Sequence, residues 1–167
     1  MTQKPRRSTK SRSAPATPAA MEENRPGNGD YVLSDQIGHL LRRAYQRHTA
    51  IFQSTIPDDK LTSVQFAVLT TVRDHPGSPL VLIARLTAID HATLRDIVLR
   101  LKRRGLLLIA PDQDDRRQRL VSLSTEGQKL VDSVIPDAQR ITELTLANLS
   151  ACERLAAIEV LKKLSTD

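Results

Sequence analysis

Hydrophobic side chains recur at helical spacing along most of the chain, and the central stretch between residues 78 and 127 contains two short runs of this kind. The first run covers residues 80–86, follows Ser78 and Pro79, and is long enough for about two turns. The second extends from about residue 91 to 104 and has apolar side chains at i, i+3, i+4 and i+7, namely Leu94, Ile97, Val98 and Leu101. Two helices separated by a tight turn at residues 87–89 are therefore predicted.

The residues that flank the second run fit the two ends of a helix. Asp90 is suited to cap the first turn, because its carboxylate can accept from the free backbone amides there. Gly105 is suited to end the helix, since glycine tolerates the left-handed conformation. Apolar runs at residues 106–110 and 119–123 are separated by a turn-forming segment at 111–117, which predicts a hairpin. Helix, turn, helix and hairpin in this order predict a winged helix-turn-helix, a module that reads duplex DNA.

Helical periodicity also predicts longer elements on both sides of this winged stretch. A long helix is expected at residues 31–55, a second at 61–73, and a third at 125–149 after the N-cap residue Ser124. Ser150 and Glu153 form a capping box that opens a last helix, with apolar side chains along one side: Leu155, Ile158, Leu161 and Leu164. The fold is therefore expected to be mainly α. Because no other lobe is available to cover the C-terminal helices, they suggest the interface of a homodimer.

Composition separates a tail from one folded domain. Residues 1–30 are rich in Pro, Ser and Ala and hold six basic and three acidic residues, a balance of +3, which predicts a disordered basic tail. The whole chain has 25 basic and 19 acidic residues, a balance of +6, so residues 31–167 keep +3. The folded domain is therefore only mildly basic, and any attraction to nucleic acid depends on where its charges lie.

Positive charge is concentrated in the winged stretch, which holds nine Lys and Arg residues between positions 85 and 119. An α-helix fits the major groove and its N-terminal side chains reach base edges, which favours His91, Thr93 and Arg95 for reading bases. Arg116 and Arg117, at the hairpin tip, are suited to the adjacent minor groove. Phosphate contacts are expected from three other basic residues: Lys102, Arg103 and Arg119.

The same charges also fit a plainer interpretation, in which they are solvated side chains on an exposed helix and hairpin. Five acidic residues lie among them: Asp90, Asp96, Asp112, Asp114 and Asp115. On charge alone, a helical interaction module that never touches DNA and a ligand-independent architectural DNA-binding protein both remain alternatives. The joint pattern of two helices, a glycine stop and a basic hairpin favours the DNA-binding hypothesis.

These motifs resemble the MarR family (multiple antibiotic resistance regulators). The matching signature is Asp-Arg-Arg at residues 115–117, followed by Leu-Val-Ser-Leu-Ser-x-x-Gly at 120–127. The segments Arg-Leu-Lys-Arg-Arg-Gly-Leu at 100–106 and Leu-Thr-x-x-Gln-Phe-x-x-Leu at 61–69 also fit. The resemblance covers about residues 31–165.

The resemblance implies a transcriptional repressor and homodimer, in which helices at residues 31–55 and 125–165 join two winged lobes, residues 61–124. The two lobes would bind a palindromic operator on double-stranded DNA. The resemblance further implies that the protein leaves DNA when a small molecule, often an aromatic acid or phenol, binds between the lobe and the dimer interface. Residues 38–52 are similar to the branch of the family that represses nicotinate degradation and senses 6-hydroxynicotinate.

Polar side chains of the first helix are the candidates for binding such an effector. His39 and His48 can donate to or accept from a carboxylate or ring hydroxyl near neutral pH, and Arg42 and Arg43 can hold a carboxylate with two hydrogen bonds. The same residues also fit a role as ordinary polar side chains at a surface or interface. Their spacing does not choose among 6-hydroxynicotinate, salicylate and a benzoate.

Other kinds of site have little support in the sequence. No nucleotide-binding loop or nucleophile motif points to an enzyme or a cofactor, and no cluster has the spacing of a zinc site. His39 and His48 point to opposite sides of one helix, so they are not expected to share a metal ion. The single cysteine, Cys152, excludes an internal disulfide, suits the cytoplasm and is expected to be a buried, inert thiol. No apolar run approaches the ~18 residues of a membrane span.

Overall fold

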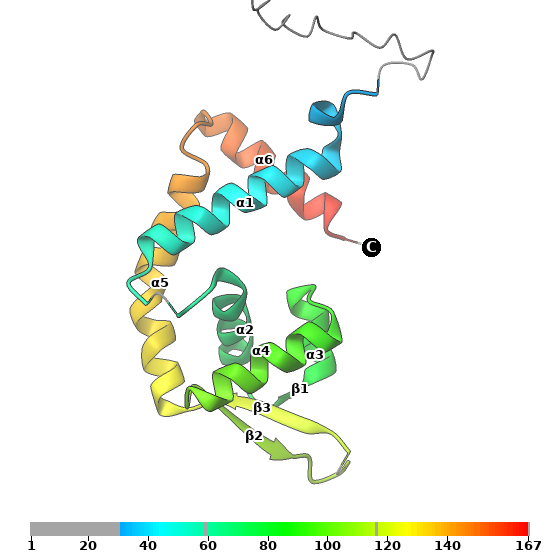
Figure 1. Cartoon of the computed structure of the whole chain (residues 1–167), viewed down its shortest axis with the longest axis vertical. Helices are drawn as coiled ribbons and strands as arrows, with labels where there is room; N and C mark the ends of the chain where they lie inside the picture. The colour runs from blue at the N-terminus through cyan, green and yellow to red at the C-terminus, as the bar shows by residue number, and fades with distance from the viewer. Residues whose placement is uncertain (1–30, 59, 116, 167) are drawn as a thin grey trace, which may run out of the picture. The chain divides into compact units, whose positions relative to one another are not determined.

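The computed structural model describes residues 31–166 apart from 59 and 116 (Figure 1). The predicted tail, residues 1–30, and the wing residue Arg116 lie outside the described residues. The described residues from Ser34 onward form one compact unit. The elements follow in the order η1 (Leu33–Asp35), α1 (Ile37–Thr55), α2 (Ser63–Asp74), β1 (Ser78–Pro79), α3 (Leu80–Thr87), α4 (His91–Arg103), β2 (Leu107–Pro111), β3 (Arg119–Leu123), α5 (Thr125–Thr145) and α6 (Ala151–Leu164). None of the described helices is both long and apolar enough to cross a membrane.

A three-stranded antiparallel sheet holds the wing, the predicted hairpin of β2 and β3 with its connecting turn, against the helices. β3 is the middle strand, and its Val121 lies opposite Ile109 of β2 and Ser78 of β1. The amide of Gly77, which has a φ of 70°, donates to the Val121 carbonyl at 3.0 Å. Strand β1 was not predicted, because two residues are too few to show alternation. It ties the residue before α3 to the wing.

The core of the lobe lies where α2, α3, α4, the sheet and α5 meet. All four apolar positions predicted for one face of α4 are buried, as are side chains from the other elements, among them Leu69, Val72, Ile83, Val121 and Val131. Burying an aliphatic side chain of this size contributes about 1.5–3 kcal/mol. These contacts therefore fix one face of α4, and they leave its polar face directed to solvent.

Gly105 ends α4 as predicted. Its φ is 73°, its amide donates to the Lys102 carbonyl at 2.9 Å, and the amide of Leu106 donates to the Leu101 carbonyl at 3.0 Å. This pair of hydrogen bonds is the Schellman motif of a glycine-terminated helix. The helix consequently stops at residue 103 and the strand starts at residue 107, each one position from its predicted limit.

Two helices were predicted to be longer than they are. The first helix begins at Ile37 instead of residue 31, because Gln36 has an extended backbone and Leu33–Asp35 form a 3-10 turn. Helix α5 continues through Pro136 but ends at Thr145 instead of residue 149, because a turn at residues 146–148 precedes the next cap. Apolar side chains in that turn had extended the helical pattern in the sequence.

The chain passes from β3 into α5 where two backbone segments come very close. Ser124 caps α5 as predicted, since its hydroxyl oxygen accepts from the Gly127 amide at 3.0 Å. The same hydroxyl donates to the Gly105 carbonyl at 2.6 Å, and the Ser124 amide donates to the Leu106 carbonyl at 3.1 Å. Gly127 is buried against that Leu106 carbonyl, with no room for a Cβ atom.

Helix α6 has the predicted capping box but buries none of its described side chains. Glu153 accepts from the Ser150 amide at 2.8 Å, and the Ser150 hydroxyl oxygen accepts from the Glu153 amide at 3.4 Å. Leu155 is 70% and Leu164 59% exposed. Cys152 is exposed as well, so the prediction of a buried thiol was wrong for the single chain. The apolar side of α6 is thus available to a partner.

Candidate nucleic-acid interface and adjoining cavity

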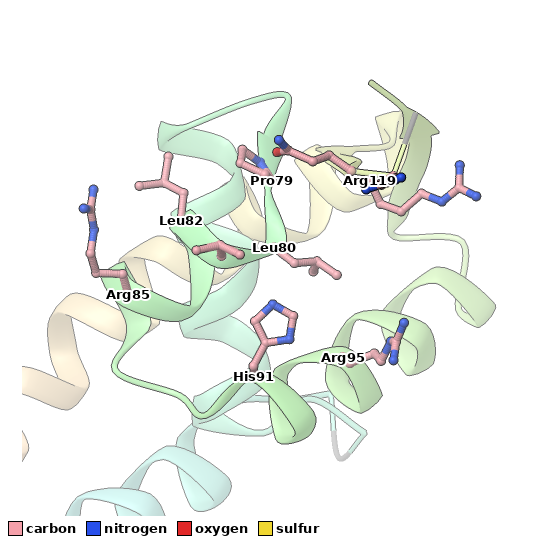
Figure 2. Close-up of a pocket in the computed structure, with 10 residues that line it drawn as sticks. Pro79, Leu80, Leu82, Arg85, His91, Arg95 and Arg119 are labelled. Atoms are coloured by element: carbon pink, nitrogen blue, oxygen red, sulfur yellow. The ribbon is translucent and has the colours of Figure 1, made fainter. Parts of the chain in front are cut away.

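A hollow of about 650 Å³ opens between α3, the start of α4 and the wing. Its apolar lining consists of Pro79, Leu80, Val81 and Leu82. Its polar lining includes four arginines and consists of Arg85, His91, Arg95, Arg117, Gln118 and Arg119. Figure 2 shows His91 rising from the start of α4 toward Leu80, with Arg85 and Arg95 on opposite sides of it. The hollow therefore combines apolar side chains with a strong concentration of positive charge.

The start of α4 is positioned by local hydrogen bonds. Ala88 has a left-handed backbone, with a φ of 52°, which ends α3 and turns the chain toward α4. Asp90 caps α4 as predicted, because its carboxylate accepts from the Thr93 amide at 2.9 Å. His91 and Arg95 then lie one turn apart on the same face of the helix. Since Leu94 and the rest of the opposite face are buried, both side chains are directed outward.

The turn of the wing uses its acidic residues as backbone acceptors. The carboxylate of Asp115 accepts from the Arg117 amide at 2.9 Å, and that of Asp112 accepts from the Asp114 amide at 2.9 Å. The Gln118 amide donates to the Asp115 carbonyl at 2.8 Å. Asp112 and Asp115 therefore shape the tip. Arg117 lies in this turn, and Arg119 is the first residue of β3.

The structure brings together four of the eight residues predicted to contact DNA: His91, Arg95, Arg117 and Arg119. Thr93, Lys102 and Arg103 are exposed on α4 but do not line the hollow. Arg116 lies outside the described residues. Arg85 was missed as a site residue, although it was counted among the basic side chains. The tight turn at residues 87–89 that follows its helix was predicted, but the left-handed backbone of Ala88 within that turn was not.

Arg104 does not line the hollow but contacts the loop between α1 and α2. Its guanidinium donates to the Lys60 carbonyl at 2.8 Å and forms an ion pair with the half-buried Asp58 at 2.5 Å. This arginine therefore joins the end of α4 to the loop between α1 and α2. The cationic hollow is formed without it.

The cap of α4 gives the fold a pH dependence. Hydrogen bonds from Thr93, first from its side chain and then from its amide, hold the pKa of Asp90 below its ordinary value of 3.8. A lowered folded-state pKa means that the carboxylate stabilises the fold above the unfolded-state pKa, and that this contribution disappears as the pH falls through the folded-state pKa.

We expect the wild-type protein to have a higher free energy of unfolding than Asp90→Ala at neutral pH, and we expect this difference to decrease as the pH is lowered to about 3. Urea denaturation of both proteins at each pH measures the difference. Asp90→Asn is the matched control, because asparagine caps a helix without titrating. A wild-type advantage that stayed constant over the whole range would show that the Asp90 carboxylate is not the stabilising group.

A second cavity, of about 380 Å³, lies between α1, α2 and the turn after α3. Tyr45 and His48 come from α1, Ser63, Val64 and Ala67 from α2, and Thr87, Ala88 and Ile89 from the end of α3 and its turn. Apolar and hydrogen-bonding side chains are thus mixed in a space large enough for one aromatic ring with its substituents.

Of the four residues predicted to bind an effector, His48 lines this cavity. His39 is half-buried and Arg42 and Arg43 are exposed along α1, and none of the three is among the described residues that line it. Their roles as effector ligands stay predictions. Tyr45 was missed, although helical spacing from His48 points to it, since residues three apart share a face. The lining residues of α2 and of the turn after α3 could not be found by periodicity within α1.

No protein-family model matches the chain. A curated relative, the HTH-type transcriptional repressor NicR of Pseudomonas putida, is 47% identical over 137 residues, which cover 82% of this chain and 87% of NicR. The chain is thus similar in sequence to a transcriptional repressor over nearly the whole length of that protein.

Solved structures give the same result. BpsR of Bordetella bronchiseptica, whose DNA binding is regulated by 6-hydroxynicotinic acid, is 50% identical and has a TM-score of 0.74, covering 79% of this chain and 100% of BpsR. PcaV of Streptomyces coelicolor, a transcriptional regulator solved with its natural ligand, is 29% identical with a TM-score of 0.75, covering 80% of this chain and 94% of PcaV. These TM-scores show that both proteins share the fold described above.

Proposed function

Because the chain belongs to the MarR family of winged helix-turn-helix regulators, we propose that it is a homodimeric transcriptional repressor that a small aromatic acid releases from a palindromic operator. The observation that supports this most directly is the cationic hollow, which joins the start of a helix to the wing. We infer a cytoplasmic location from the proposed partner, chromosomal DNA.

The hollow has the chemistry needed to hold duplex DNA. His91 and Arg95 occupy the first turns of α4, where side chains reach base edges when a helix lies in the major groove. Arg117 and Arg119 in the wing supply guanidinium groups for the adjacent minor groove and for phosphates. Arg85 adds a further phosphate ligand at the end of α3.

The proposed dimer uses the apolar side of α6 together with exposed residues of α1. Leu155, Leu161 and Leu164 are 70%, 46% and 59% exposed, and Leu40 of α1 is 46% exposed. An uncovered apolar surface of this kind in a single chain favours burial against a second copy. A two-fold dimer presents two α4 helices, which accounts for a palindromic operator.

The second cavity is the proposed effector site. Val64, Ala67 and Ile89 suit an aromatic ring, while Tyr45, His48 and Ser63 offer hydrogen bonds. The cavity also contacts Ala88, whose left-handed backbone directs the chain into α4. A ligand that binds better when this turn is displaced shifts the protein toward a state in which α4 no longer fits the operator. Because 6-hydroxynicotinic acid regulates DNA binding by BpsR, it is the first acid to test on this protein.

The test is a mobility-shift titration on DNA upstream of the protein's own gene, with and without 6-hydroxynicotinate at fixed salt. Tight binding that resists competitor DNA and is released by the acid is the expected result. Tight binding that the acid does not change would show that 6-hydroxynicotinate is not the effector. Weak binding without sequence preference, unaffected by acids, would favour the ligand-independent architectural protein.

His48→Ala is expected to weaken the effect of the acid on DNA binding by about 10-fold, because it removes a hydrogen-bonding group from the cavity. The acid concentration that releases half of the DNA is the quantity to measure. His75→Ala is the matched variant, since His75 is an exposed histidine at the end of α2, outside the lining of this cavity and not predicted to bind the effector. An unaltered acid response in His48→Ala would place the effector elsewhere.

A further inference from the structure

A hydrogen-bond chain joins the effector cavity to α5. The Nδ1 atom of His48 lies 3.1 Å from the hydroxyl oxygen of Thr145, across the contact between α1 and α5. The Thr145 hydroxyl in turn donates to the Ile141 carbonyl at 2.7 Å. His48 and Thr145 are both half-buried. The three groups therefore form a short chain that starts at a residue lining the cavity and ends on the backbone of another helix.

The direction of this chain follows from the number of hydrogens available. A threonine hydroxyl has one hydrogen, and here the Ile141 carbonyl accepts it. Toward His48 the hydroxyl oxygen acts only as an acceptor, so the Nδ1 atom of His48 must carry a hydrogen and donate it. A neutral imidazole with hydrogen on Nδ1 has a free lone pair on Nε2. The Nε2 atom is then an acceptor.

We propose that Thr145 is a positioning residue that sets the specificity of the effector site, by holding His48 in the tautomer whose Nε2 accepts a hydrogen bond from the ligand. The complementary ligand group is a donor, either a ring hydroxyl or the ring N–H of its keto form, and not the carboxylate. This inference rests on the proposed function, because it assigns a role within the proposed effector cavity.

The lining of the cavity fits this assignment. Its described lining residues include no acidic side chain that would compete with the ligand for Nε2 of His48. Tyr45 and Ser63 carry hydroxyl groups that are able to donate, so they are the suitable partners for the acid group of the ligand. A site built to pair with a hydroxyl discriminates against the analogue without one, because its own polar group is then left unpaired.

The first part of the test is nitrogen NMR of histidine-labelled protein without ligand at a pH where His48 is neutral. His48→Gln identifies the resonances. We expect a protonated Nδ1 and an unprotonated Nε2 in the wild-type protein and in Thr145→Ser. In Thr145→Val, which keeps the shape but loses the hydroxyl, we expect the Nε2-protonated form that predominates in free histidine. An Nε2-protonated wild-type His48 would overturn the proposal.

The second part is the ratio of affinities for 6-hydroxynicotinate and nicotinate, measured by titration calorimetry. We expect Thr145→Val to reduce the wild-type preference for the hydroxylated acid by about 3- to 10-fold, the range for one hydrogen bond, and Thr145→Ser to retain it. Thermal unfolding midpoints show that each variant is folded. A merely structural Thr145 would lower both affinities equally, and an unchanged ratio would overturn its role in specificity.

The two parts separate this inference from the proposed function. If neither acid binds the wild-type protein, the proposed effector is wrong and the specificity role of Thr145 is overturned with it. If 6-hydroxynicotinate binds and releases DNA while His48 has the other tautomer, the effector is correct and only the inference about Thr145 is overturned.

Discussion

Gly127→Ala is expected to lower the free energy of unfolding by about 3 kcal/mol or more, a large share of the ~5–15 kcal/mol that stabilises a typical folded protein. A Cβ atom at this position would overlap the carbonyl oxygen of Leu106, and it would also contact the Leu123 side chain at 3.3 Å. The obstructing atom belongs to the backbone, so a change of side-chain rotamer cannot relieve the overlap.

The surrounding hydrogen bonds make a backbone shift costly. The Leu106 carbonyl accepts from the Ser124 amide at 3.1 Å, and the Ser124 hydroxyl joins the Gly105 carbonyl and the Gly127 amide. Moving the start of α5 away from Leu106 would stretch these bonds together. It would also separate α5 from the base of the wing. The expected cost therefore exceeds that of an ordinary overpacked side chain.

Gly38→Ala is the matched control for this substitution. Gly38 lies within α1, and a Cβ atom there meets nothing within 4 Å. Alanine at an open helical position is expected to stabilise the protein by about 0.5–1 kcal/mol. Urea denaturation of the three proteins measures both effects. A Gly127→Ala protein as stable as the wild type would mean that the two segments separate easily at this point.

Much of the fold followed from local patterns, because the elements concerned carry their own start and stop signals. Asp90, Gly105, Ser124 and Ser150 were all assigned from the sequence as helix ends, and the structure confirms each of them. The start of α1 had no such signal. Gln36 makes no side-chain cap, so helical periodicity alone extended the helix too far toward residue 31.

The sites were harder to predict, because they are made where elements meet. His91 and Arg95 could be chosen from their place at the start of a helix. Arg85 lines the same hollow, from a helix that ends where Ala88 takes a left-handed conformation, and an alanine in the sequence does not predict that conformation. Thr145 meets His48 from a helix 97 positions away along the chain, and no spacing rule connects such residues. Gly127 was recognised as part of a motif, but the reason for glycine appears only in the contact with Leu106.

Arg117→Ala is expected to weaken operator binding by about 10- to 100-fold at fixed salt without unfolding the protein, in line with the loss of one well-placed guanidinium contact. Arg117 is exposed, and its backbone amide donates a hydrogen bond to the Asp115 carboxylate, which alanine at this position also makes. Fluorescence anisotropy with labelled operator DNA measures the affinity, and circular dichroism checks the fold.

Two further variants identify what Arg117 contributes. Arg140→Ala removes the same charge from an exposed position on α5, outside the hollow, and is expected to change the affinity by less than about 3-fold, as a distant charge screened by salt.

Arg117→Lys keeps the charge but loses the planar guanidinium. If lysine restores binding, the contact is with phosphate, and alanine should lower the dependence of log K on log salt by about 0.9. If lysine fails, Arg117 acts in the minor groove. Equal losses in Arg117→Ala and Arg140→Ala would instead show that net charge alone draws this protein to DNA and that the wing has no specific part.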